Sequence, residues 1–80
     1  MTVTVLLFAR FRELAETEAA VLDLPEGCTL GEAWEAVRRK YPALAGELRP
    51  MMALDRAYRG ADARIGSGSE VAFFPPVSGG

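Results

Sequence analysis

The sequence predicts one α+β domain in which a mixed sheet carries one main helix packed across it. Three observations lead to this fold class: apolar strand-like runs at both ends of the chain, a single well-signalled helix between them, and short turn-bounded segments elsewhere. The chain has 80 residues, of which 50% are hydrophobic and 25% charged. This is the composition of a globular protein, and the length leaves room for one hydrophobic core only.

The first predicted strand covers residues 2–8. Val3, Val5 and Leu7 alternate with threonines at its start, so they share one face. Because the other face also becomes apolar towards Phe8, we expect this strand to lie in the middle of the sheet with its second face partly covered.

A short helical turn is expected over residues 10–16, with Phe11 and Leu14 on its buried side. The next predicted strand, residues 19–24, is close enough in sequence to pair antiparallel with the first. Turn-forming residues at positions 25–27 end it.

The main helix has the strongest signals in the chain. Thr29 and Glu32 have the spacing of a capping box, and Pro42 stops the helix. Trp34 is expected to pack in the core. The apolar residues that share its face are Leu30, Ala33, Val37 and Tyr41.

Four further segments complete the predicted fold. We expect one helical turn within residues 43–48, a fully apolar strand at 51–54, a short edge strand at 57–59 and a last strand at 70–74. A hairpin, a crossing helix and a final strand that returns beside the first describe a β-grasp, ubiquitin-like roll.

The composition excludes several classes of function. A net charge of −2 argues against a nucleic-acid-binding surface. No apolar run is long enough to span a membrane, and nothing predicts a signal peptide or an oxidising compartment, so we expect a cytoplasmic protein. There is no histidine and one cysteine, Cys28. We therefore expect no metal site, no cofactor bound by this chain and no self-contained enzyme.

The end of the chain is its most unusual stretch. After the predicted domain, residues 1–74, Pro75 and Pro76 end the strand ladder and favour a stiff extended segment. The tail of residues 75–80 spans at most roughly 20 Å. It ends in Gly79 and Gly80, which lack side chains. We interpret the Gly80 carboxylate as the working group, which must be activated by a partner, for example as an acyl-adenylate.

The run Phe73-Phe74-Pro75-Pro76-Val77-Ser78-Gly79-Gly80, together with Phe8-Ala9-x-x-Arg12-Glu13-Leu14, closely resembles the small, sulfur-carrier subunits of molybdopterin synthase, which are ubiquitin-like proteins. The resemblance implies that an adenylyltransferase similar to ubiquitin-activating enzymes adenylates Gly80 with ATP and Mg²⁺. A sulfurtransferase system then forms a thiocarboxylate. The tail delivers this sulfur to cyclic pyranopterin monophosphate inside the large synthase subunit, in a heterotetramer of two small and two large subunits. The small subunit is thus a co-substrate and carries no catalytic group acting on the pterin.

The same resemblance implies specific contact residues. Phe8, Tyr58 and Phe74 match apolar interface positions, and Arg12 matches an arginine near the root of the tail. The residues expected to enter a partner's channel are Pro75, Pro76, Val77, Ser78 and Gly79. Three alternatives stay open: a sulfur carrier of another pathway (thiamine or tRNA thiolation), a protein modifier joined through Gly80 to lysines, and a binding module whose tail does nothing.

Overall fold

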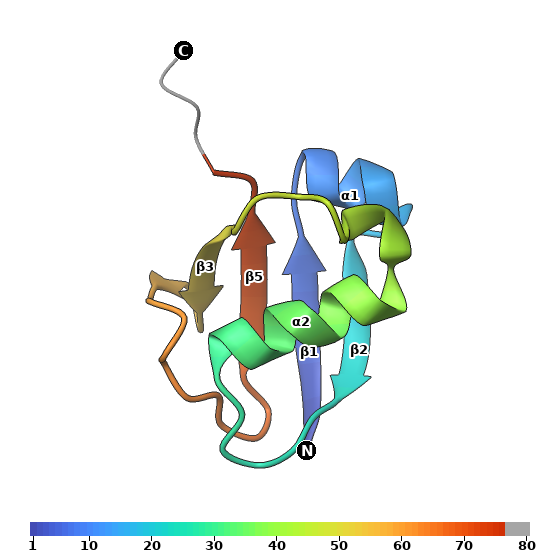
Figure 1. Ribbon diagram of the computed structural model, residues 1–80. Coiled ribbons are helices and arrows are strands. Elements are labelled where there is room, and N and C mark those ends of the chain that lie inside the picture. Colours follow the sequence, from blue (N-terminus) through green and yellow to red (C-terminus); the bar gives the residue numbers. More distant parts are fainter. Residues whose placement is uncertain (77–80) are drawn as a thin grey trace.

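The computed structural model describes residues 1–76 as a five-stranded sheet with one long helix lying across one face (Figure 1). In chain order the elements are β1 (Thr2–Leu7), α1 (Arg10–Ala15), β2 (Ala19–Asp23), α2 (Leu30–Lys40), the 3₁₀ turn η1 (Pro42–Leu44), β3 (Met51–Leu54), β4 (Ala57–Tyr58) and β5 (Glu70–Phe74).

The strand order confirms the predicted β-grasp topology. Across the sheet the order is β2-β1-β5-β3-β4. The terminal strands β1 and β5 pair in parallel at the centre, and every other neighbouring pair is antiparallel. The last strand therefore returns beside the first, and the chain leaves the sheet from its middle, at the end where α1 also lies (Figure 1).

The hydrophobic core fills the space between α2 and the sheet. Val3, Val5 and Leu7 are 0–1% exposed and point to the helix side, as their alternation predicts. The Trp34 ring lies 5.0 Å from the ring of Phe11 and 5.1 Å from that of Phe73, measured between centroids. The indole thus joins α2 to α1 and to β5, which confirms its predicted place in the core.

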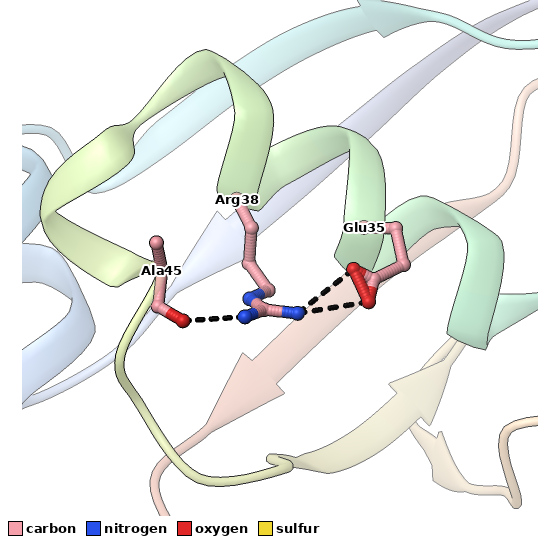
Figure 2. A network of polar contacts seen from close by, with 3 residues as sticks. All are labelled: Glu35, Arg38 and Ala45. Atoms are coloured by element: carbon pink, nitrogen blue, oxygen red, sulfur yellow. Dashed lines mark hydrogen bonds and ion pairs between the residues drawn. The ribbon is translucent and has the colours of Figure 1, made fainter.

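Both ends of α2 are held by polar contacts. At the start, the Thr29 hydroxyl accepts a hydrogen bond from the Glu32 amide at 3.3 Å, and the Glu32 carboxylate accepts one from the Thr29 amide at 2.9 Å, which completes the predicted capping box. Near the other end, the Arg38 guanidinium donates to Glu35 and to the Ala45 carbonyl (Figure 2). The arginine therefore ties the chain that follows η1 back onto the helix.

The structure differs from the sequence prediction at several element boundaries. α1, β2 and β4 each end one residue earlier than expected, at Ala15, Asp23 and Tyr58. The helical turn expected within residues 43–48 is a 3₁₀ turn at Pro42–Leu44, because Pro42 starts that turn as well as ending α2. β1 ends at Leu7, one residue earlier than expected. Phe8 nevertheless continues the ladder with one bond, since its amide donates to the Phe73 carbonyl at 3.3 Å.

Within residues 1–76, no helix is both long and apolar enough to cross a membrane. The same residues contain no group of three or more acidic or sulfur side chains placed to hold a metal ion.

Candidate protein-docking site

Three aromatic rings gather where β5 ends, on the sheet face that α2 leaves open. The rings of Phe8 and Phe74 stack with centroids 4.6 Å apart and planes 11° from parallel. Tyr58 approaches Phe74 at 5.9 Å. Phe8 and Tyr58 remain 36% and 68% exposed. Three of the four residues predicted to contact a partner therefore lie together and present apolar surface to water.

The strand register explains why a hollow lies between these rings. Leu6 on β1 pairs with Ala72 on β5, which pairs with Ala53 on β3, so the three side chains form one row across the open face. Two members of the row are alanines, which leave space that larger residues would fill. The result is a depression of about 270 Å³ beside the three rings.

Met51 completes this apolar surface and was not predicted as a contact residue. It pairs with Phe74 across β3 and β5 and is 37% exposed. The sequence around it is uniformly apolar, so it gives no alternation from which the exposed face could be inferred. We call Phe8, Met51, Tyr58 and Phe74 the tail-root patch.

On its other side, the root of the tail borders a second shallow depression of about 300 Å³. Pro75 and Pro76 line it together with the ion pair between Arg10 and Glu47, whose nitrogen and oxygen are 2.8 Å apart. The hydrogen bond from Arg10 to Glu47 raises the pKa of the arginine, which stays charged. Leu48 is 76% exposed on the same depression.

Arg12 lies exposed on α1. In residues 1–76 no ion pair or side-chain hydrogen bond includes it, whereas its neighbour Arg10 is paired. Its expected role in partner binding stays a prediction. The tail residues Val77, Ser78, Gly79 and Gly80 lie outside the described part of the chain.

Cys28 has the properties of a core residue. It is 5% exposed and belongs to the hydrophobic cluster. Burial, and secondarily the negative charge of Glu32, raises the pKa of its thiol. At neutral pH the thiol is therefore protonated and a poor nucleophile.

Comparison with known proteins agrees with this geometry. The model of the ThiS family matches residues 5–80. A molybdopterin synthase sulfur carrier subunit of Arabidopsis thaliana is 36% identical over 98% of this chain and 82% of its own length. One from Mycobacterium tuberculosis is 34% identical over 98% of this chain and 96% of its own.

Among solved structures, the fold is similar to that of SAMP1, the small archaeal modifier protein 1, from Haloferax volcanii. The TM-score is 0.85 at 29% identity, with all of both chains covered. The family match spans nearly the whole chain, includes the elements that form the tail-root patch and continues through the Gly-Gly end. The chain thus belongs to the ThiS family.

Proposed function

We propose that this protein is a sulfur carrier in molybdenum cofactor biosynthesis. The observation that carries the proposal is the position of the tail-root patch, where the chain leaves the sheet towards Gly80. A carrier needs a surface that partners recognise and, next to it, an end that they can modify. The relatives named as molybdopterin synthase sulfur carrier subunits support the same choice.

The proposed chemistry takes place at the Gly80 carboxylate in two steps. A carboxylate oxygen first bonds to the α-phosphorus of ATP, and pyrophosphate leaves. This step is catalysed by an adenylyltransferase similar to ubiquitin-activating enzymes, which holds the ATP and Mg²⁺. Hydrosulfide (HS⁻) delivered by a sulfurtransferase system then attacks the carbonyl carbon, AMP leaves, and loss of the S–H proton gives the thiocarboxylate. Activation is needed because a free carboxylate is a poor acyl donor, whereas the final thiocarboxylate is ionised and strongly nucleophilic.

The described residues contribute recognition to this cycle. The only cysteine is buried with a raised thiol pKa, and the chain has no histidine. We therefore assign general acid–base catalysis and sulfur transfer to the partners. In the proposed complex, Phe8, Tyr58 and Phe74 bind the large subunit of molybdopterin synthase, with Arg12 beside them. Pro75 to Gly79 lead Gly80 into its active site, where cyclic pyranopterin monophosphate receives the sulfur.

A second candidate function is protein modification through Gly80. The similarity to the small archaeal modifier protein favours it. The chain has one lysine, Lys40, so chains linked through its own lysines would have a single attachment site. A sulfur carrier for thiamine synthesis or tRNA thiolation uses the same Gly80 chemistry and differs only in the acceptor.

Intact-protein mass spectrometry of the protein from cells making molybdenum cofactor tests the proposal. We expect a fraction of the molecules to have one oxygen replaced by sulfur. Deleting Gly80, or replacing Gly79 by tryptophan, should abolish this fraction and leave the thermal unfolding curve unchanged. Gly66→Ala is the matched control, because its added methyl group would meet only the Ser69 hydroxyl at an ordinary 3.5 Å.

The alternatives predict different results in the same experiment. Adducts between Gly80 and lysines of other proteins, without thiocarboxylate, would favour the modifier function. Free carboxylate alone would count against both sulfur carriage and modification. Thiocarboxylate without binding to the large synthase subunit would favour another sulfur pathway.

A further inference from the structure

Two arginines flank a hollow at the edge of the tail-root patch. Arg49 precedes β3 and Arg59 follows β4, and both line a depression of about 350 Å³. Tyr58 forms part of its wall and also part of the wall of the neighbouring apolar depression. Met51 of the tail-root patch lines the arginine hollow as well, so this hollow adjoins the patch.

The backbone fixes the position of this pair. The Arg59 amide donates to the Met52 carbonyl at 3.1 Å, which continues the β3–β4 pairing by one residue. Arg49 is followed by Pro50, which is buried. The backbone of Arg59 is thus tied to β3, and Arg49 lies two residues before the same strand.

Nothing in the described chain neutralises either guanidinium. Over residues 1–76, no carboxylate lies within ion-pair distance of Arg49 or Arg59, although four arginine or amino-terminal pairs of this kind occur elsewhere. No carboxylate lines the 350 Å³ depression. Arg49 also borders a hollow beside α2 that contains acidic residues, yet it pairs with none of them. The pair is a local positive site on a protein of net charge −2.

We propose that Arg49 and Arg59 form a recognition site for carboxylate side chains of the protein that covers the tail-root patch. The inference rests on the proposed function, in which that protein is the large synthase subunit. Guanidinium groups bind carboxylates through two parallel hydrogen bonds, and such contacts strengthen when a partner excludes water. An acidic partner surface would also be attracted to this edge before the aromatic rings make contact, which speeds association and aligns the tail.

The test compares R49Q/R59Q with R39Q/K40Q as the matched control. Both variants lose two positive charges from exposed positions, but Arg39 and Lys40 lie in the last turn of α2. Binding to the purified large subunit is measured by surface plasmon resonance at ionic strengths from about 0.05 to 0.5 M. We expect R49Q/R59Q to bind about tenfold more weakly than the control at the lowest ionic strength, mainly through slower association, and to show a flatter salt dependence.

The possible outcomes separate this inference from the proposed function. Wild-type protein that carries thiocarboxylate but does not bind the large subunit overturns both. Wild-type binding with equal affinities for the two variants overturns the arginine site and leaves the proposed function intact. Weaker binding of R49Q/R59Q with an unchanged salt dependence also overturns it, because the loss would then come from packing of the side-chain stems.

Discussion

Phe74 is the residue at which the sheet meets the tail. One face of its ring stacks on Phe8, Tyr58 lies beside it, and Met51 pairs with it in register. The next residue is a proline, which restricts Phe74 to extended geometry. The ring is therefore both the centre of the tail-root patch and the point from which the direction of the tail is set.

Truncating either stacked ring should weaken binding to the partner and leave the protein folded. We expect Phe8→Ala and Phe74→Ala each to weaken binding to the large synthase subunit by about 2 kcal/mol, the cost typical of a central aromatic contact. Titration calorimetry measures this loss, and circular dichroism should show a retained fold. Val21→Ala is the control, because Val21 is 62% exposed on β2 and outside the patch. Equal affinities for all three variants would exclude the patch as the docking surface.

Ala9 carries backbone strain directly after Phe8. Its φ and ψ are 51° and −126°, a region that residues with a Cβ rarely adopt, and the Phe11 amide closes the turn onto the Phe8 carbonyl at 3.1 Å. Such a conformation costs about 1–3 kcal/mol. The turn directs α1 away from the open face and leaves the Phe8 ring accessible.

Replacing Ala9 by glycine should therefore stabilise the protein. Glycine makes the unfolded chain more flexible, which lowers stability by about 0.4–1 kcal/mol. Relief of the strain exceeds this cost, so we expect the free energy of unfolding to rise by about 1 kcal/mol. For a domain of this size that corresponds to a rise in Tm of about 4–8 °C by calorimetry. Ala45→Gly is the control and should lower Tm, because Ala45 has ordinary helical angles. A lower Tm for Ala9→Gly would show that the turn is not strained.

At the scale of the elements, the sequence predicts most of what the structure contains. Alternation places Val3, Val5 and Leu7 on the core side, and the Thr29–Glu32 spacing marks the start of α2, because both patterns reflect local geometry. Features that depend on distant pairing are not visible in the sequence. The exposed side of Met51, for example, follows only from the register of β3 with β5.

Positive φ angles at residues other than glycine also could not be predicted from the sequence. Glu16 ends α1 in the left-handed region at φ 58°, where glycine is the usual residue. Neither Glu16 nor Ala9 has a side chain that signals a positive φ. Phe8 and Phe74 could be placed together because each ends a predicted strand and the two strands were expected to be neighbours. Tyr58 was matched only through the family resemblance, and Arg12 could not be given a contact.

The capping box of α2 predicts a stability effect with a defined pH dependence. Thr29→Ala should cost about 1 kcal/mol in chemical denaturation, since it leaves the Glu32 amide without its acceptor. Hydrogen bonds from the Thr29 amide and hydroxyl lower the pKa of Glu32. A lowered pKa in the folded state means that the carboxylate contributes stability above the ordinary glutamate pKa of about 4.3 and loses it as the pH falls through the lowered value.

Glu32→Gln isolates this contribution, because the amide oxygen can still accept from Thr29 but does not titrate. We expect wild type to be more stable than the variant at about pH 7 and the difference to shrink towards about pH 2. Thermal unfolding at several pH values measures it. A difference that grows on acidification would contradict the assigned direction of the shift.

At the scale of the whole molecule, the two faces of the sheet have different roles. One face and α2 form the core, and the other face carries the tail-root patch. Consecutive residues of β5 serve both sides: Phe73 is fully buried against Trp34, and Phe74 stacks on Phe8. Core packing therefore positions the docking surface through a single strand, the same strand that leads into the tail.

Trp34→Ala tests this division. Trp34 is 5% exposed and packs on Phe11 and Phe73, so its truncation should cost about 3–5 kcal/mol. That is a large share of the stability of an ordinary small domain, about 5–15 kcal/mol. We expect urea denaturation to show this loss. Thiocarboxylate loading should fall only as far as the folded fraction falls, and stabilising osmolytes should restore it.

Trp34→Phe is the control. It keeps an aromatic ring at the position and should lose less stability and less thiocarboxylate loading than Trp34→Ala. If Trp34→Ala remained fully folded but could not be loaded, the indole would have to take part in partner recognition, although it lies on the face of the sheet opposite to the tail-root patch.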